Sequence, residues 1–221
     1  MVITPLHGAS APSGLKDLLP LLEDWRKLMR RLAREWKADK DCPWWYLERT
    51  AVGFFSASVW SQGGRAIEEY GTDKKSRTHK KTMCNGRGDL MFSVNSKSHE
   101  QWFVAEAKQS HPPLRGKLKV LKTRIRSKLK QARQDAVRCK RFGCSRLGLL
   151  FLCPYAAVRP PSLVEIRKWI SNLHAAYPKN KAALAWTFPT VTRGLSYGTG
   201  KKREFYPGVA LLVRRPRRIV N

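Results

Sequence analysis

Two carboxylates and a lysine, set in two neighbouring apolar segments, are the residues of this chain best suited to chemistry. Asp89 begins the segment 89–94 (DLMFSV), and Glu106 and Lys108 end the segment 101–108 (QWFVAEAK). A carboxylate is costly to bury unless a cation accompanies it. If the two acids lie together in these apolar surroundings, they require a cation, such as a metal ion, between them.

A β-hairpin would bring these three residues together. Both segments have the composition and length of β-strands, and a short polar segment separates them. In a symmetric hairpin Leu90 faces Ala105 and Asp89 faces Glu106, and directly opposed side chains share one face of the sheet. Lys108 follows Glu106 by two residues and therefore lies on the same face. The alternative is an edge hairpin in which Glu106 and Lys108 form a solvated salt-bridge cluster.

The overall charge of the chain favours a polyanionic partner. The 221 residues include 44 Lys and Arg against 16 Asp and Glu, which gives a formal net charge of +28. So large an excess destabilises a compact chain through self-repulsion, and binding to nucleic acid would relieve it. The alternative on charge alone is a non-catalytic basic binding protein or a ribosomal-type structural protein. Because acids are scarce, two of them on one hairpin face indicate a specific role.

Cysteine usage and the patterning of the chain favour a cytoplasmic protein with one domain. The five cysteines form no C-x-x-C pair and have no nearby His at zinc-finger spacing, so we expect reduced thiols. The sequence contains neither a signal-peptide pattern nor an apolar run of membrane-spanning length. We expect residues 1–14, with their two Pro and two Gly, to be a flexible leader, and residues 15–221 to be a single domain.

Helical patterns precede the hairpin. Apolar residues at helical spacing predict a helix from Leu18 to Trp36, with Lys and Arg on its outer face. Asp41 and Pro43 have the residue types expected at the start of a second helix. That helix would carry Glu48 on its apolar side, where an acid requires a partner.

Lys and Arg gather in a predicted loop before the hairpin and in a predicted helix after it. Residues 66–70 (AIEEY) predict a short helical piece that ends at Gly71, and residues 72–87 predict a basic polar loop. A long helix is predicted over residues 118–141, with cations around a narrow apolar stripe. This clustering predicts contacts to nucleic acid. The candidate residues are Lys74, Lys75, Lys80, Lys81, Arg87, Arg124, Lys128, Lys201 and Lys202.

The order of the predicted elements indicates the fold class. After the hairpin and the long helix come an apolar strand ended by Pro154, a helix with a capping box at Ser162 and Glu165, and strands over 182–188 and 206–213. Helices on either side of a hairpin and further strands predict an α/β protein with a mixed (α+β) sheet flanked by helices.

An Asp at the start of one strand and Glu-x-Lys at the end of the next resemble the PD-(D/E)XK superfamily of nucleases. Gly88-Asp89 and Glu106-Ala107-Lys108 carry the resemblance, with Gly88 where the family name has Pro. The resemblance covers residues 44–155 and implies a restriction-endonuclease-like core.

The resemblance also implies an activity, a Mg²⁺-dependent endonuclease that hydrolyses phosphodiester bonds in DNA, with Mn²⁺ as a substitute ion. Asp89 and Glu106 would hold the metal, the main-chain carbonyl of Ala107 would add a ligand, and Glu48 would be the third acid. Lys108 would assist the attacking water and offset charge on the phosphorus.

Several alternatives stay open at this point. Glu68 or Glu69 could replace Glu48 as the third acid, and Gln131 would be an accessory residue from the helix after the hairpin. The substrate could be RNA, or the protein could bind nucleic acid without cutting it. A homodimer would supply two active sites for duplex cleavage.

Overall fold

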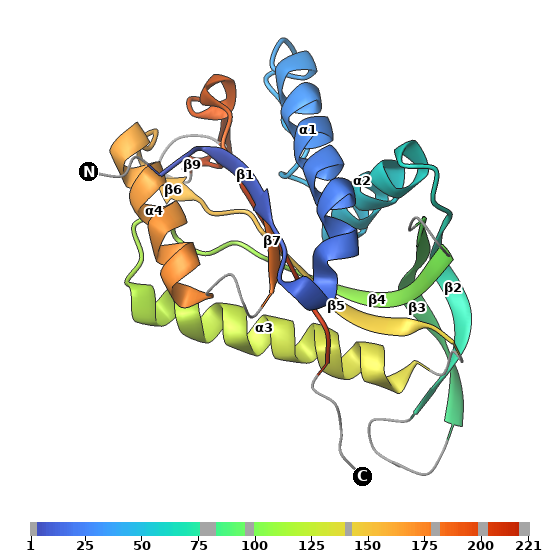
Figure 1. The fold of residues 1–221 in the computed structure, drawn as a ribbon. Coiled ribbons are helices and arrows are strands. Elements are labelled where there is room, and N and C mark those ends of the chain that lie inside the picture. Colours follow the sequence, from blue (N-terminus) through green and yellow to red (C-terminus); the bar gives the residue numbers. More distant parts are fainter. Residues whose placement is uncertain are drawn as a thin grey trace.

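A seven-stranded mixed sheet forms the centre of the molecule, in the strand order β1-β7-β10-β5-β4-β3-β2 (Figure 1). β4 and β5 run parallel, and the other neighbouring strands run antiparallel. The computed structural model describes residues 4–75, 83–95, 100–139, 143–177, 182–198 and 203–216. The strands of this sheet are β1 (His7–Ser10), β2 (Ala66–Lys75), β3 (Met83–Asn95), β4 (Glu100–Ser110), β5 (Ser145–Leu152), β7 (Ala183–Thr187) and β10 (Val209–Arg214).

Helices cover both faces of this sheet, and a small second sheet lies beside it. α1 (Leu19–Glu35) and α2 (Glu48–Ser61) pack on one face, and α3 (Leu118–Arg138) and α4 (Leu163–Ala176) on the other (Figure 1). None of the described helices is both long enough and apolar enough to cross a membrane. The remaining elements are two short 3₁₀ helices (Ser13–Leu18 and Thr190–Thr192) and the strands β6 (Ala156–Ala157), β8 (Ser196–Tyr197) and β9 (Glu204–Phe205), in the order β6-β9-β8.

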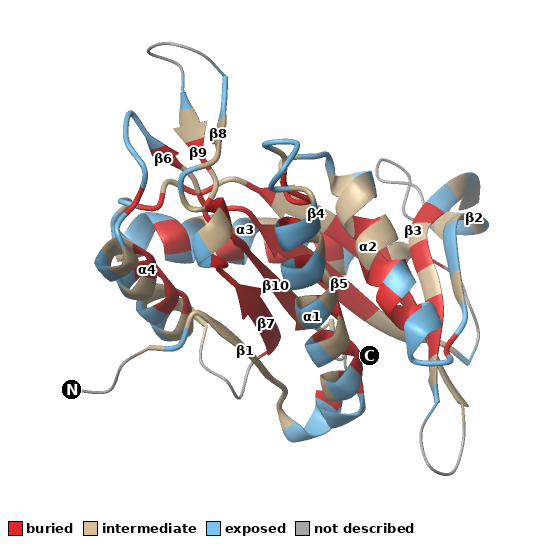
Figure 2. Ribbon diagram, turned by 90° about the horizontal axis from the view of Figure 1, so that it is seen from above, coloured by how far each residue is buried: buried red, intermediate tan, exposed pale blue. Residues whose placement is uncertain are grey.

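The central strands are buried on both faces, as the continuous apolar run in β5 predicts. Leu149 and Phe151 of β5 belong to the core under α1 and α2, whereas Leu150 and Leu152 belong to the core under α3 and α4. Figure 2 shows β7 and β10 buried along their length in the same way. Burial of each large apolar side chain stabilises the fold by about 1.5–3 kcal/mol. The two cores hold the sheet rigid where the candidate residues sit.

Gly148 on β5 lets α3 lie very close to the sheet. A Cβ atom at this position would be 2.6 Å from Cγ of Arg133 and 2.9 Å from its backbone nitrogen. No side chain larger than hydrogen fits such an approach. Gly148 pairs with Glu106 on β4. The glycine therefore brings the last turns of α3 close to the candidate carboxylate.

Several predicted elements are confirmed. α1 and α3 occupy the predicted helices, and Leu90 lies opposite Ala105 in the hairpin as expected. The capping box at Ser162 and Glu165 begins α4. α3 ends at Arg138 rather than at residue 141 because the next residue pairs with β2 in an isolated bridge.

Two segments before the hairpin differ from prediction. The sequence predicts a flexible leader over residues 1–14, but His7–Ser10 forms β1 and pairs with β7 along the sheet edge. The second helix begins at Glu48 rather than just after Asp41. Trp44 is buried and donates its indole N–H to the carbonyl of Tyr206 at 2.9 Å. Contacts with the core, rather than helix propensity, therefore determine the structure of this segment.

A long ribbon of two strands replaces the helix and most of the loop predicted before the hairpin. Residues 66–70 are the start of β2, and β2 pairs with β3 as far as Lys75 opposite Met83. Residues 76–82 lie outside the described part of the chain. A helix of about five residues cannot offset its nucleation cost, whereas pairing with β3 provides backbone hydrogen bonds from Ala66 to Lys75 on one side of the strand.

Candidate active site where β3 and β4 separate

The candidate site lies where the hairpin ladder ends and side chains take over its hydrogen bonds. The paired register runs from Asn95 opposite Glu100 to Leu90 opposite Ala105, so Asp89 lies just past its end. There the Asp89 carboxylate accepts the backbone N–H of Ala107 at 2.7 Å. Two residues further on, the Glu48 carboxylate from α2 accepts the backbone N–H of Gln109 at 2.7 Å. Asp89 thus lies close enough to its predicted neighbour Glu106 to raise the pKa of that carboxyl, and a side chain rather than a strand pair joins β3 to β4.

A bend in β2 accompanies this separation. Glu68 pairs with Leu90 and Tyr70 with Gly88, and Glu69 between them has a φ of 47°. A residue other than Gly in this left-handed region costs roughly 1–2 kcal/mol. Glu69 accepts a hydrogen bond from Nε of Arg49 at 2.8 Å and lies 3.0 Å from an Arg87 nitrogen. Glu69 therefore bends the ribbon opposite Asp89, and its carboxylate belongs to two arginines rather than to the site.

Glu106 is a buried carboxylate neutralised by a lysine from β2. Its side chain is 5% exposed, and Oε1 lies 2.6 Å from Nζ of Lys74 and 3.2 Å from the Sγ of Cys139. Burial raises the pKa of Glu106, the charge of Asp89 adds to the rise, and Lys74 opposes it. Burial acts to lower the pKa of Lys74, but its bond to Glu106 outweighs this effect and the pKa is raised. The pair is thus a buried ion pair in which each charge depends on the other.

Lys108 is held between carboxylates from two helices. Its ammonium donates to the carbonyl of Ala107 at 2.6 Å. Glu48 of α2 and Asp135 of α3 each place an oxygen 3.8 Å from the same nitrogen. The ammonium therefore sits beside the carbonyl that the family resemblance assigns to a metal.

Glu48 is the helical acid that reaches the site. Burial raises its pKa, and the charge of Asp89 adds to the rise, while Lys108 and the N–H of Gln109 oppose it. Of the two alternatives, Glu68 is exposed on β2 and Glu69 is bound by the arginines described above. The geometry therefore favours Glu48 as the acid beside Lys108.

Two residues at the site, Asp135 and Cys139, were not predicted from the sequence, and Lys74 was predicted only as a contact to nucleic acid. Gln131, the predicted accessory residue, is exposed on α3, and Asp135 one turn further along faces Lys108 instead. A signal for Asp135 exists, because it is the only acid among eight Lys and Arg in α3. Lys74 and Cys139 carry no such signal, since their contact with Glu106 depends on the bridge that joins β2 to the end of α3.

The donor atoms at the site have the chemistry that Mg²⁺ prefers, although no ready-made cluster of three acids is present. Within the described residues, no group of three or more His, Cys, Asp and Glu is arranged to hold a metal ion. The Asp89 and Glu106 carboxylates and the Ala107 carbonyl are hard oxygen donors, and Mg²⁺ is commonly held by one or two carboxylates together with water. Each of these three groups accepts a hydrogen bond from the protein. A metal would therefore have to displace Lys74 or Lys108 from its acceptor.

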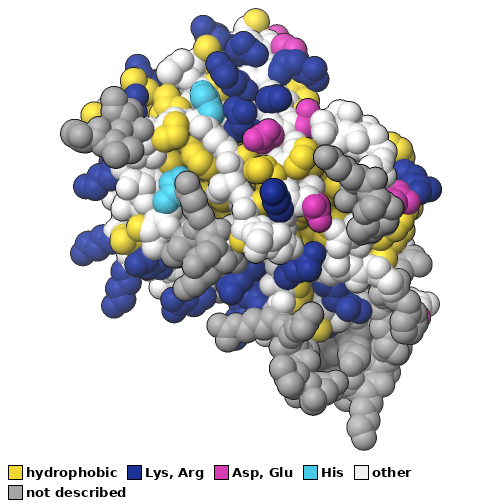
Figure 3. All heavy atoms as spheres, in the orientation of Figure 1, with side chains coloured by type: hydrophobic (Ala, Val, Ile, Leu, Met, Phe, Trp, Pro, Cys, Tyr) yellow, Lys and Arg dark blue, Asp and Glu magenta, His cyan; other side chains and the backbone are white. Residues whose placement is uncertain are grey.

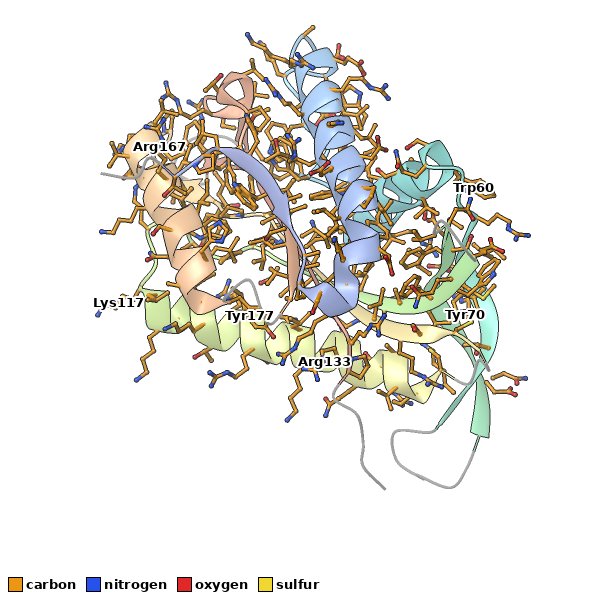
Figure 4. The ribbon with its side chains drawn as sticks, viewed as in Figure 1. Trp60, Tyr70, Lys117, Arg133, Arg167 and Tyr177 are labelled. Atoms are coloured by element: carbon orange, nitrogen blue, oxygen red, sulfur yellow. The ribbon has the colours of Figure 1, made fainter. Side chains whose placement is uncertain are left out.

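Tyr70 leaves room only for Gly at position 88. A Cβ atom at Gly88 would lie 2.4 Å from Cζ of Tyr70, whose side chain is buried at the β2–β3 edge of the sheet (Figure 4). Neither Ala nor Pro can be added without moving this ring.

Gly88→Ala is therefore expected to lower the free energy of unfolding by about 1–3 kcal/mol through overpacking. Gly71→Ala, on the partner strand, is the matched control. No atom of the described residues lies within 4 Å of its Cβ position. Chemical denaturation monitored by tryptophan fluorescence measures both variants. Equal stability of the two would contradict the close packing of Tyr70 on Gly88.

The predicted nucleic-acid contacts fall into three groups. Lys74 and Arg87 face carboxylates within the protein, so the prediction that they contact phosphate is not supported by their positions. Arg124 and Lys128 line an open hollow on α3, where Arg124 also donates to the carbonyl of His111 at 2.7 Å. The predicted contacts outside the described part of the chain are the side chain of Lys75, and Lys80, Lys81, Lys201 and Lys202.

Positive charge nevertheless dominates the surface. Figure 3 shows Lys and Arg side chains spread over the visible face, with few acids among them. Figure 4 shows Lys117, at the start of α3, pointing away from the body of the protein.

Comparisons of the chain with protein-family models, with curated proteins and with solved structures find no match.

Proposed function

We propose that this protein is a divalent-metal-dependent endonuclease that hydrolyses phosphodiester bonds in DNA, built on a restriction-endonuclease-like core. The observation that supports the proposal is the grouping of three side chains where β3 and β4 separate: Asp89 accepts the N–H of Ala107, Lys108 donates to the carbonyl of Ala107, and the charge of Asp89 acts on the buried Glu106. Glu48 adds a fourth ionisable group from α2. Buried, mutually interacting charges of this kind are typical of catalytic sites, although structural ion pairs also produce them.

Asp89, Glu106 and the Ala107 carbonyl would hold Mg²⁺ or Mn²⁺, which when bound supplies an acidified water and offsets charge on the phosphoryl oxygens. Lys108, fixed by carboxylates on both sides, is positioned to stabilise the negative charge that develops on the phosphorus. The raised pKa of Glu48 suits this carboxylate to exchange a proton nearer neutral pH than an ordinary Glu.

The charge of α3 supports nucleic acid as the substrate. This helix carries eight Lys and Arg and one acid, and the acid faces Lys108 rather than solvent. Lys128 lies close enough to Glu48 to lower its pKa. A phosphate backbone lying along α3 would therefore end beside the candidate site.

A specific observation also favours a second candidate, a basic protein that binds nucleic acid without cutting it. Glu106 already has a cation in Lys74, so its burial is explained without a metal ion. In that case the carboxylates and lysines would hold β2, β3, β4 and α3 together, and the surface charge would provide binding.

Cleavage of supercoiled plasmid separates the two candidates. The proposal predicts nicked or linear product with Mg²⁺ or Mn²⁺ and intact plasmid with EDTA, because the carboxylates alone supply no acidified water. The Asp89→Asn protein, purified in parallel, controls for contaminating nucleases.

A gel-shift assay on the same plasmid completes the test. Binding without cleavage in either metal would exclude the endonuclease and support the second candidate. Degradation of RNA with DNA spared would assign the site to RNA.

A further inference from the structure

Exposed aromatic side chains gather next to the candidate site. Tyr46 is 43% exposed and Tyr197 is 63% exposed, although they lie on segments far apart in the sequence. The ring of Trp45, the residue before Tyr46, packs edge-on against Tyr197 with the centroids 5.9 Å apart, while the ring of Tyr46 packs edge-on against Trp36. Exposed aromatic rings that lie close together are typical of surfaces that bind a partner.

Direct contacts join these rings to the site. Glu48 follows Tyr46 by two residues, and Gln109, whose backbone N–H binds Glu48, donates its side-chain amide to the carbonyl of Tyr46 at 2.9 Å. Trp44 is anchored through its indole N–H to Tyr206. The aromatic ledge is defined as Trp45, Tyr46 and Tyr197; the backbone of Tyr46 is bonded to β4 just beyond Lys108, and Tyr197 joins the ledge through its contact with Trp45.

A shallow, open hollow lies among the outer side chains of α3, near the site. All of its lining residues belong to α3, and Arg124 among them donates to the carbonyl of His111, two residues beyond Gln109. Three cations and two hydroxyl side chains border this hollow, whose exposed surface is otherwise mostly apolar, and the ledge offers aromatic rings. Its lining residues are Lys119, Val120, Thr123, Arg124, Ser127 and Lys128.

Cations suit the phosphate backbone of a single strand of nucleic acid, and aromatic rings suit its unpaired bases. Proteins bind single strands by pairing a positively charged groove with aromatic side chains on which the bases stack. In a continuous duplex the base faces are already stacked on one another and are closed to a protein ring. A duplex would therefore use the hollow on α3 without using the ledge.

We propose that the ledge stacks unpaired bases, so that the substrate presented to the site is a single-stranded segment, such as an overhang or a flap. This inference rests on the proposed function for its biological meaning, but binding of a single strand can be measured without any cleavage.

Fluorescence anisotropy in EDTA tests the inference with a labelled single-stranded oligodeoxynucleotide and the duplex of the same sequence. Tyr197→Ala and Tyr46→Ala are each expected to weaken single-strand binding by roughly fivefold to a hundredfold, the range that corresponds to loss of one stacked base, and to leave duplex binding within about twofold. Tyr197→Phe keeps the ring and should bind like wild type. The matched control is Trp60→Ala, which removes a ring that is 57% exposed at the other end of α2 (Figure 4).

The outcomes separate this inference from the proposed function. Three results would contradict base stacking on the ledge. The tyrosine variants could lose equal affinity for single strand and duplex, they could lose none, or Trp60→Ala could lose as much affinity as they do. If the protein cleaves DNA with metal but the tyrosine variants bind single strands like wild type, the proposed endonuclease stands and the ledge does not. Ring-dependent single-strand binding without cleavage would keep the ledge and remove the endonuclease.

Discussion

Asp89→Asn is expected to abolish metal-dependent cleavage of DNA while leaving the fold intact. The Asn side chain retains an oxygen that can accept the N–H of Ala107, so β3 and β4 stay joined. Only the negative charge is lost, and with it the affinity for a divalent cation. A metal contributes several kcal/mol of transition-state stabilisation, so the cleavage rate should fall by roughly 10²- to 10⁴-fold.

Asp89→Ala and Asp73→Asn complete this test. Asp89→Ala removes the acceptor as well as the charge, so it should also lower the free energy of unfolding by about 1–3 kcal/mol. Asp73→Asn changes an exposed acid on β2, in the same ribbon, and should cleave like wild type. Quantified plasmid nicking and thermal unfolding of the three proteins give both readouts. Full cleavage by Asp89→Asn would remove Asp89 from the site and the endonuclease with it.

The hairpin and its register can be predicted from the sequence because they depend on local patterns. Two strand-like segments with one short polar connection have few ways to pair, and a shift by one residue would exchange the two faces. Leu90 therefore lies opposite Ala105 as expected. The period of two then places Glu106 and Lys108 on the same face, which α3 covers.

The ribbon formed by β2 and β3 could not be predicted in the same way. Residues 66–75 are rich in charge and contain no alternation of apolar and polar residues, so local preference indicates a helix or a loop. Pairing with β3 decides their structure instead. Because the segment was predicted as a loop, the contact between Lys74 and Glu106 was missed: a lysine in a loop has no assigned neighbour, whereas on β2 it reaches Glu106.

Asp135 was missed for a different reason. The helix was predicted correctly, but the side that faces the sheet depends on how α3 packs, and Gly148 sets that approach through its contact with Arg133. Gln131 and Asp135 are one turn apart, yet only Asp135 reaches Lys108. A periodic pattern thus places a stripe on a helix more reliably than it places a single polar residue at a site.

Lys74→Met is expected to lower the free energy of unfolding by about 3–5 kcal/mol, the cost of removing one partner from a buried ion pair. Met fills much of the volume of the lysine stem but leaves Glu106, 5% exposed, without that ammonium group. Urea denaturation measures the loss. The control is Lys119→Met, which removes an exposed cation from α3 and should change stability little.

The pH dependence of the loss identifies Glu106 as its source. Glu106 has a raised pKa even beside Lys74, and removal of the lysine raises it further. A carboxyl group with a folded-state pKa above its unfolded value favours the folded state when protonated and disfavours it when charged. The deficit of Lys74→Met should therefore be largest at mildly alkaline pH and shrink as the pH falls through the pKa of Glu106. If the stability lost by Lys74→Met does not depend on pH, lost packing rather than the unpaired charge of Glu106 would be its cause.

Divalent metal gives this variant its diagnostic value, because Lys74 and a metal ion would neutralise the same carboxylate. If Glu106 is a metal ligand, Mn²⁺ should raise the melting temperature of Lys74→Met more than that of wild type, since a ligand that binds only the folded state stabilises it. Lys74→Met combined with Glu106→Gln should lose both the pH dependence and the response to Mn²⁺. A pH-dependent deficit that Mn²⁺ does not relieve would mean that Glu106 exists to pair with Lys74, and the protein would then be a binder of nucleic acid rather than a nuclease.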